Sequence, residues 1–197
     1  MKKVLAVTVL LLFISITGYS QFGVTGGINL SSLRIIKDYP SDGAIMRIGA
    51  HIGGFYEVRL FNNFYLQPQL LFSYDPTSVK RKLDNGQDVI DTRNGYYLNL
   101  PVMLSYKIPI KESNRLGFDF GAYWSHGLFG RGKVIRPDDS GDRGSAPLFE
   151  YGGYNDLGLI GGVRYELNDY IFSARTRYGL NDVTLLLMLS VGYKFGK

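Results

Sequence analysis

The amino-acid sequence predicts an all-β fold: an eight-stranded antiparallel up-and-down transmembrane β-barrel that follows an N-terminal signal peptide. The first observation is a repeated alternation of apolar and polar side chains over about ten residues, which suits a tilted strand that crosses a bilayer. The second is a composition rich in Gly (25), Tyr (15) and Phe (12), as expected for many strands, tight turns and an aromatic belt. The third is an export signal at the start of the chain.

The first twenty residues have the three parts of a secretory signal peptide. Lys2 and Lys3 form the positive start, residues 4–16 are mostly apolar, and Gly18 and Ser20 supply small residues near the expected cleavage site. The apolar run is shorter than the roughly 20 residues that a transmembrane helix needs. We therefore expect residues 1–20 to be a cleaved signal peptide and residues 21–197 to be the outer-membrane β-barrel domain.

The first three strands follow from the alternation. We expect them over residues 22–30, 47–60 and 64–74, with Asn62-Asn63 as a tight turn between the second and the third. Their apolar faces consist of Phe22, Val24, Ile28 and Leu30; Ile48, Ala50, Ile52, Tyr56, Val58 and Leu60; and Phe64, Leu66, Leu70, Phe72 and Tyr74. Their polar faces include Thr25 and Asn29; Arg47, His51, Glu57 and Arg59; and Gln67, Gln69 and Ser73.

The fourth and fifth strands carry the clearest pattern. Over residues 96–107 the apolar face consists of Leu98, Leu100, Val102, Leu104 and Tyr106, and the other face of Asn99, Pro101, Met103, Ser105 and Lys107. Over residues 116–125 the apolar face consists of Leu116, Phe118, Phe120, Ala122 and Trp124, and the other face includes Asp119, Tyr123 and Ser125. Both stretches read as half-buried strands.

The last three strands are expected over residues 156–167, 170–179 and 184–195, with the first two joined by a turn at Asn168-Asp169. Their apolar faces consist of Leu157, Leu159, Val163, Tyr165 and Leu167; Tyr170, Phe172, Ala174 and Tyr178; and Leu185, Leu187, Leu189, Val191, Tyr193 and Phe195. Their polar faces include Asp156, Arg164 and Glu166; Ser173, Arg175 and Arg177; and Thr184, Ser190 and Lys194.

The connections broadly alternate between long and short, as in bacterial outer-membrane barrels. We expect loops around Asp38 to Gly43, around Asp84-Asn85-Gly86 and from His126 to Tyr154. A longish inner turn from Pro109 to Asn114 and a very short loop at Asn181-Asp182 depart from the rule. Because both flanking strands place even-numbered residues outward, we expect a three-residue loop over 84–86 with a bulge at Gly86, and Lys82 opposite Asp88.

Two prolines lie inside predicted strands. Proline cannot donate to a strand ladder. Pro68 and Pro101 are expected to be neighbours in the hairpin of the third and fourth strands, so we expect a bulge or an unpaired spot there.

Three features place the apolar face in lipid rather than inside a soluble barrel. Glycines recur on the polar face, where they make room for Arg and Tyr in a crowded interior. Aromatic residues of the apolar face gather near the strand ends, as in interfacial girdles. The export signal carries the chain past the inner membrane. A secreted soluble barrel is the alternative.

An eight-stranded barrel is just wide enough for its own side chains to fill it. The predicted interior bases are Arg47, Arg59, Lys107, Arg164, Arg175, Arg177 and Lys194, and the predicted interior acids are Glu57, Asp119, Asp156 and Glu166. Buried charges are costly unless they are paired, which favours a salt-bridged plug over a continuous pore. The alternative is a narrow anion channel lined by arginines.

Several segments resemble one family of proteins. The segments FYLQPQLLFSY, YYLNLPVMLSYK, GFDFGAYWS, the glycine-containing stretch from Asp156 to Gly162, and the closing SVGYKF resemble the PorT-like outer-membrane β-barrel family. The resemblance covers nearly all of residues 21–197 and implies this fold in the cell outer membrane. It also implies, as one alternative, a component of a type IX protein secretion apparatus. The chain departs from such barrels by ending in Gly196-Lys197 after the aromatic Phe195.

The sequence offers no convincing catalytic set. Ser125 and His126 are neighbours on opposite faces of a strand and cannot form a nucleophile–base pair, and His51 is expected to be a satisfied interior side chain near Glu57 or Arg47. The acids Asp138, Asp139, Asp142 and Glu150 lack the spacing of a calcium loop. Glycine-rich GVTGG and GLIGG lie in strands rather than before a helix. We expect no catalytic, cofactor-binding or metal-binding residue.

These observations favour a non-enzymatic integral outer-membrane protein that acts through its loops or rim as a structural or interaction protein. The expected partners are outer-membrane lipid and lipopolysaccharide, with other envelope or secretion proteins as a further option, and the barrel is expected to be monomeric. The competing class is a lipid-A-modifying enzyme.

Overall fold

The computed structural model describes residues 20–34, 41–82, 88–111, 113–135, 143–149, 154–181 and 184–195. The predicted signal peptide, apart from Ser20, lies outside these residues. So do the predicted bulge at Gly86 and the loop acids Asp138, Asp139, Asp142 and Glu150. No helix among the described residues is long and apolar enough to cross a membrane.

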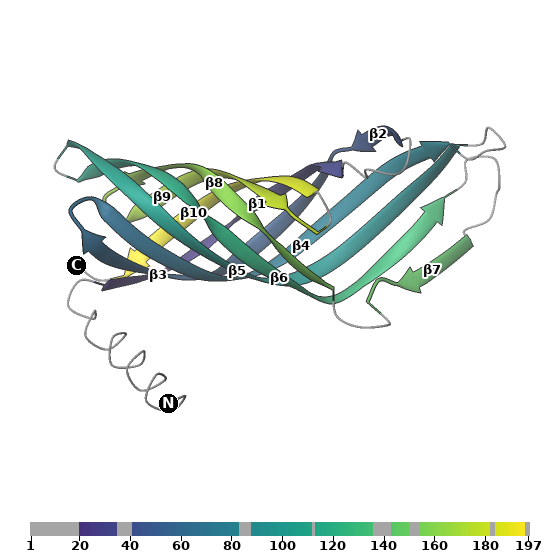
Figure 1. The fold of residues 1–197 in the computed structure, drawn as a ribbon, viewed down its shortest axis with the longest axis horizontal. Coiled ribbons are helices and arrows are strands. Elements are labelled where there is room, and N and C mark those ends of the chain that lie inside the picture. Colours follow the sequence, from purple (N-terminus) through teal and green to yellow (C-terminus); the bar gives the residue numbers. More distant parts are fainter. Residues whose placement is uncertain are drawn as a thin grey trace, which may run out of the picture.

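Eight antiparallel strands of the described chain close into a ring (Figure 1). The ring runs β1-β3-β4-β5-β6-β8-β9-β10 and returns to β1 through the β1–β10 pairing. Its strands are β1 (Ser20–Arg34), β3 (Arg47–Phe61), β4 (Phe64–Lys82), β5 (Asp88–Lys111), β6 (Asn114–Ile135), β8 (Asn155–Leu167), β9 (Tyr170–Gly179) and β10 (Thr184–Phe195). The predicted barrel, with its eight strands in up-and-down order, is confirmed.

Short turns join the strands at one end of the barrel, which we call the lower end. Asn62 and Asn168 occupy the left-handed region in two of these turns, with φ of 44° and 53°, a conformation that asparagine tolerates better than most residues. The predicted longish turn from Pro109 to Asn114 is wrong, because β5 continues to Lys111 and pairs it with Asn114. Both described ends of the chain, in β1 and β10, lie at the lower end (Figure 1).

Three strands are much longer than predicted. β4, β5 and β6 continue beyond the barrel at its upper end, where they pair with the short strands β2 (Ser41–Ile45) and β7 (Arg143–Pro147) (Figure 1). Parts of three regions predicted to be loops are therefore strands. We call the portions of β4, β5 and β6 above Tyr74, Tyr96 and Phe129, together with β2 and β7, the upper sheet.

The registers confirm the parity argument. Lys82 lies opposite Asp88, and the β4–β5 register holds from there to Phe64 opposite Tyr106. The ladder is interrupted between the Pro68–Val102 and Leu71–Asn99 pairs without a shift of register. The unpaired spot predicted beside Pro68 and Pro101 is confirmed, and its cause is the missing N–H of proline.

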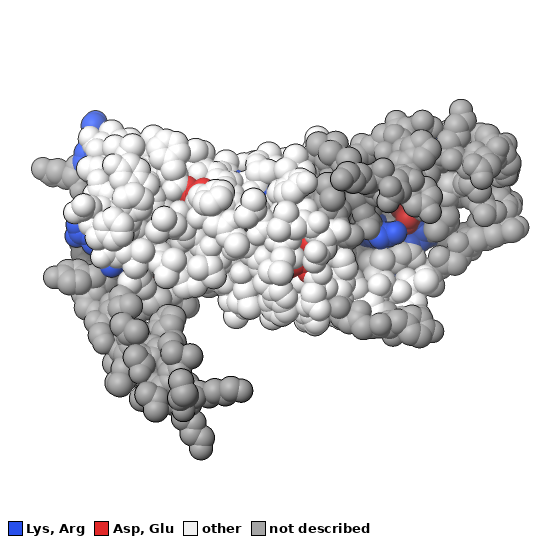
Figure 2. Space-filling model, in the orientation of Figure 1, with Lys and Arg blue, Asp and Glu red and all other residues white. Residues whose placement is uncertain are grey.

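The apolar faces predicted for the ring strands point outward. Leu100, Phe120 and Leu187 are 38%, 66% and 38% exposed, whereas Arg164 and Arg175 are only 1% and 4% exposed. Figure 2 shows a mainly white middle of the barrel, with basic residues at the left rim and a mixed charged group toward the right. A soluble barrel would have the reverse arrangement, so the prediction of an oily outer wall is confirmed.

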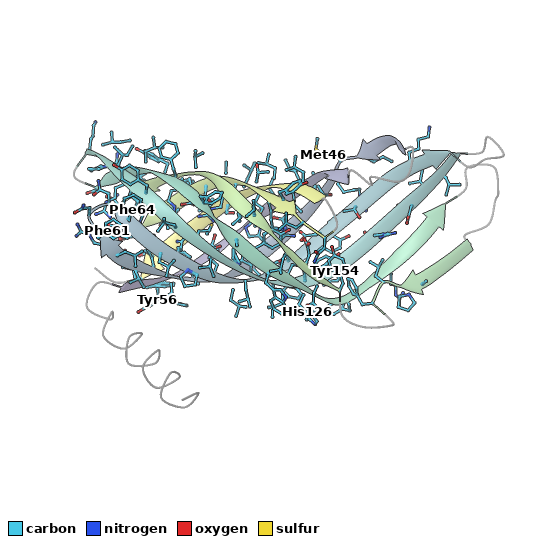
Figure 3. All side chains as sticks on the ribbon, in the orientation of Figure 1. Met46, Tyr56, Phe61, Phe64, His126 and Tyr154 are labelled. Atoms are coloured by element: carbon cyan, nitrogen blue, oxygen red, sulfur yellow. The ribbon has the colours of Figure 1, made fainter. Side chains whose placement is uncertain are left out.

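Aromatic side chains form a band near each end of the oily wall. The lower girdle includes Phe61 and Phe64, labelled at the left of Figure 3, with Tyr106, Tyr170, Tyr193 and Phe195. The upper girdle includes Phe72, Tyr74, Tyr96 and Phe129. Tyr96 and Tyr106 are ten residues apart on β5, about 33 Å along the strand. At a tilt of about 40° this is about 25 Å along the barrel axis, the height of a bilayer-facing band.

Candidate functional site

The barrel interior is filled by ionised side chains. The buried bases are Lys107, Arg164, Arg175, Arg177 and Lys194, and the buried acids are Glu57, Asp75, Asp119, Asp156 and Glu166. With histidine counted as neutral, these five positive and five negative charges sum to zero. A balanced set avoids the large cost of an uncompensated buried charge.

Arg164 is the centre of the larger group of contacts, which we call the lower network. Its guanidinium lies 2.7 Å from Asp119 Oδ1 and 3.0 Å from Glu57 Oε2, and it donates to Ser105 Oγ at 2.7 Å. The network also includes Lys107, Lys194, Glu166, Arg175 and Gln67. Lys107 and Lys194 each contact both Glu57 and Glu166, so the carboxylates are shared rather than paired singly.

The interior glycines make room for these long side chains, as predicted. A Cβ atom on Gly117 would lie 2.6 Å from Arg164 Cγ, a distance that real Cβ atoms do not show. Gly117 lies opposite Arg164 in the β6–β8 ladder, so the side chain of Arg164 crosses the neighbouring strand on its way to the barrel centre. Glycine is the residue that permits this close approach.

A second set of contacts, the upper network, lies nearer the upper end. Arg177 donates to Asn99 Oδ1 at 2.8 Å and to Asp75 Oδ2 at 3.3 Å, and Asp75 also accepts from Ser73 and Asn29. Asn99 donates to Ser73 Oγ at 2.7 Å. Asp75 was not among the predicted interior acids, because the third strand was expected to end at Tyr74.

A buried apolar cluster lies between the two networks on several strands. The buried side chains Leu71, Met103, Tyr123, Ile160, Leu186 and Met188 form one cluster. On β4, β5, β6 and β8 a member of this cluster lies between a charged or polar residue near the lower end and another near the upper end. On β3 the buried Phe55 takes the same place between Glu57 and His51. On β9, in contrast, Arg175 and Arg177 are consecutive inward residues, and they lie opposite Met188 and Leu186 of the cluster.

One chain of hydrogen bonds has the connectivity of a nucleophile, a base and an orienting group. His51 Nε2 lies 2.9 Å from Ser190 Oγ, His51 Nδ1 lies 2.6 Å from Asn29 Oδ1, and Asn29 donates to Asp75 Oδ1 at 2.6 Å. The prediction that His51 is a satisfied interior side chain is confirmed, but its neighbours are not Glu57 or Arg47. Ser190 and His51 are 6% and 5% exposed, so the hydroxyl faces packed protein rather than a substrate space.

Most of the charged residues predicted for the interior lie there. Nine of the eleven predicted interior charges are buried. Arg59 is exposed and donates to the carbonyl of Asn62, because β3 has an irregularity between Arg59 and Phe61 beside the turn. Arg47 is only half-buried at the upper end, 3.5 Å from Ser78 Oγ.

Ser125 and His126 lie on opposite faces, as predicted. Ser125 is buried in the interior, whereas His126 stacks on the outward ring of Trp124 with centroids 5.6 Å apart. Within the described residues, no group of three or more His, Cys, Asp or Glu side chains could hold a metal ion.

Aromatic side chains close the upper mouth of the interior. The rings of Tyr97, Phe149 and Tyr154 lie 5.8 to 6.0 Å apart, and Leu148 lies over Gly130 and Gly132 of β6. Figure 3 places Tyr154 where the barrel meets the upper sheet. The segment after β7 thus folds back onto the face of the upper sheet that continues the barrel interior.

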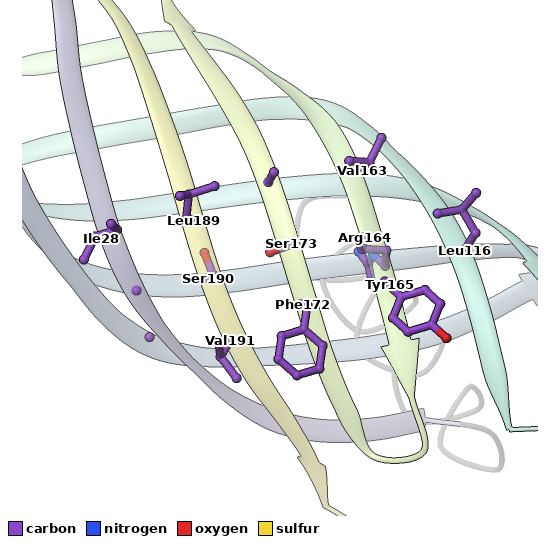
Figure 4. Close-up of a pocket in the computed structure, with 13 residues that line it drawn as sticks. Ile28, Leu116, Val163, Arg164, Tyr165, Phe172, Ser173, Leu189, Ser190 and Val191 are labelled. Atoms are coloured by element: carbon purple, nitrogen blue, oxygen red, sulfur yellow. The ribbon is translucent and has the colours of Figure 1, made fainter.

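A hollow of about 520 Å³ lies on the oily wall across β1, β10, β9, β8 and β6 (Figure 4). Its rim includes Ile28, Leu116, Phe172, Leu189 and Val191. Its polar lining residues are Arg164, Tyr165, Ser173 and Ser190, of which Arg164 and Ser190 direct their side chains to partners in the interior. Most of the lining is apolar, which suits contact with hydrocarbon.

Solved structures of other outer-membrane proteins are similar to this chain at low sequence identity. OprG from Pseudomonas aeruginosa is 15% identical, with a TM-score of 0.50 over 91% of this chain and 97% of OprG. Ail from Yersinia pestis, solved in complex with the heparin analogue sucrose octasulfate, is 17% identical, with a TM-score of 0.46 over 90% and 99%. The neisserial surface protein NspA is 15% identical, with a TM-score of 0.42 over 88% and 95%.

No curated protein matches the sequence. A family model, the outer membrane protein beta-barrel domain, matches residues 15–185, which include seven of the eight ring strands and the start of β10. The family match agrees with the closed ring, the oily wall and the two aromatic girdles of the structure, and it places the protein in the outer membrane. The chain belongs to the outer membrane protein beta-barrel domain family.

Proposed function

We propose that this chain is a non-enzymatic, monomeric outer-membrane protein that acts at the cell surface through its upper sheet. The observation that carries the proposal is the length of β4, β5 and β6. From Tyr96 in the upper girdle, β5 extends eight more residues to Asp88, about 27 Å along the strand. Crossing the bilayer requires none of this length, so the upper sheet serves contact with something outside.

The contents of the barrel support a plugged interior. The arginines that could line an anion channel are bonded to carboxylates or amides, and a buried apolar cluster lies between the two networks on β4, β5, β6 and β8. The Ser190–His51 pair is buried, with exposed fractions of 6% and 5%. These features favour a stable anchor for the upper sheet over a channel or a lipid-A-modifying enzyme.

The resemblance to the PorT-like family supports a more specific version of the proposal. In that version the protein is one component of a type IX secretion apparatus, and its contacts are with other envelope proteins. Partners at the lower rim, on the periplasmic side, would then matter as much as partners of the upper sheet.

Position-specific crosslinking in intact cells separates these versions. A photo-crosslinking residue at Ala146, exposed on β7, reports on the cell surface, and one at Lys111, exposed at the lower end, reports on the periplasm. We expect a specific protein or surface-polymer adduct from Ala146 only. Adducts from Lys111 alone would contradict action through the upper sheet and favour the secretion component.

A trimmed variant provides the functional arm. In this variant a short turn joins Thr77 directly to Arg93, which are partners in the β4–β5 ladder, and replaces the residues between them. The change removes the tip of the upper sheet and leaves the ring intact. We expect normal membrane insertion, loss of the Ala146 adduct and no change in the lipid A mass spectrum. Steady conductance of the intact protein in planar bilayers would contradict the plug.

A further inference from the structure

The outward surface above the upper girdle has a niche with an unusual lining. Tyr74, Tyr96 and Phe129 form a continuous aromatic platform, with ring centroids 5.0 Å apart for the first pair and 4.6 Å for the second. These three rings, with Asn94, Gly130 and Arg131, line a hollow of about 480 Å³. The lining combines apolar faces with one guanidinium and one amide.

The strand registers give the height of this niche in the membrane. Phe129 lies opposite Tyr96 in the upper girdle, and Arg131 lies opposite Asn94 one outward position higher. Two residues span about 7 Å along a strand, or about 5 Å along the axis at a tilt of about 40°. Arg131 therefore lies just above the hydrocarbon boundary, at the level of lipid headgroups.

The charges of this surface favour an anion. The lining of the niche has one charged side chain, that of Arg131, and no carboxylate. Asp91 and Arg93, which lie 3.5 Å apart, occupy the alternate positions of β5 and so the opposite face. Arg131 is exposed, and no ion pair to it is present among the described residues.

The amide of Asn94 is oriented for donation. The hydroxyl of Tyr74 donates to Asn94 Oδ1 at 3.0 Å, which fixes the amide and assigns its Nδ2 as the group that remains for a ligand. A guanidinium and an amide donor beside each other match the oxygens of a phosphate monoester. The aromatic platform below them matches the apolar part of the same molecule.

We infer that this niche binds the phosphorylated sugar headgroup of an outer-leaflet glycolipid of the lipid A class. Arg131 contacts the phosphate, Asn94 donates to the phosphate or to a sugar hydroxyl, and the acyl chains descend over Tyr96 and Phe129. This site does not depend on the upper sheet binding a macromolecule, so the two proposals fail independently.

Native mass spectrometry of the detergent-solubilised protein tests the inference. The probes are lipid A, lipid A with both phosphates removed, and phosphatidylglycerol. For Arg131→Gln we expect the affinity for lipid A to fall about tenfold, since a charge-assisted bidentate contact is lost. Asn94→Ala should lower it by a smaller factor. The control Lys111→Gln removes an exposed base at the other end of the barrel and should leave the affinity unchanged.

The relative affinities for the three probes, in the native protein and in the variants, support or overturn the inference. Tighter binding of lipid A than of its dephosphorylated form, lost in Arg131→Gln and weakened in Asn94→Ala, supports the site. Equal binding of the dephosphorylated form, or full affinity in Arg131→Gln, overturns it. Phosphatidylglycerol that binds as tightly and with the same dependence on Arg131 overturns the assignment to a glycolipid. Mobility of the unheated proteins on gels establishes that each variant is folded.

Discussion

Asp119→Asn tests the lower network most directly. Asp119 Oδ1 accepts from Arg164 and from Ser105, each at 2.7 Å, and Oδ2 accepts from Arg175 Nε at 2.8 Å. The substitution keeps the shape of the side chain and removes its charge, so that two buried guanidiniums lose their shared anion. The interior charge then rises from zero to +1.

The expected cost is large. Removal of one partner from a buried ion pair costs about 3–5 kcal/mol, because the remaining charge is left without compensation. With a urea dependence of about 2 kcal/mol per molar, the unfolding midpoint should fall by about 1.5–2.5 M. Urea titration in detergent micelles, with the folded fraction read from the gel mobility of unheated samples, measures this shift.

A second substitution separates charge from packing. Arg175→Met in the Asp119→Asn background removes one of the two guanidiniums, returns the interior charge to zero and fills a similar volume. We expect the midpoint to recover most of the loss. An unchanged midpoint in Asp119→Asn, or a further fall in the double variant, would refute the view that charge balance holds the plug together.

Three further predictions concern other layers of the barrel. Val102→Arg should destabilise the membrane-inserted protein by about 2–4 kcal/mol, because this 47% exposed side chain lies midway between Tyr96 and Tyr106 of the two girdles and so faces the middle of the bilayer; folding into vesicles of increasing urea content measures it. Gly117→Val should lower the unfolding midpoint because its side chain occupies the path of Arg164, and the milder Gly117→Ala should lower it less. Ser190→Ala should cost about 1–3 kcal/mol by leaving His51 Nε2 unpaired, while the lipid A mass spectrum stays the same; an altered acyl pattern would instead mean that the pair is catalytic.

The sequence was sufficient for the ring because the alternation has a period of two and lipid enforces it on every strand. Parity alone placed Arg164, Arg175 and Glu166 in the interior and Lys82 opposite Asp88. The predicted strand limits were wrong above the upper girdle, where the strands no longer lie in lipid. Above Tyr74 and Tyr96 the outward face of the strands no longer meets lipid and the apolar pattern fades, so β4 was expected to end too early and β5 to begin too late.

The contacts inside the barrel were beyond the reach of sequence patterns. His51 and Ser190 are 139 residues apart and meet only because the ring closes between β1 and β10. The stagger of the strands around the ring decides which interior residues lie at the same height, and no local motif encodes that stagger. A strand-by-strand register, derived from parity at each turn, is the signal that would have found this pair.

The division of the buried charges between two layers has an electrical consequence. The lower network has four bases and three acids, whereas Arg177, Asp75 and Asp156 give the upper part of the plug an excess of one acid. An anion that enters from outside first meets repulsion at the upper layer, and a cation that enters from the periplasm first meets repulsion at the lower one. The two networks therefore form a dipole inside a plug whose total charge is zero.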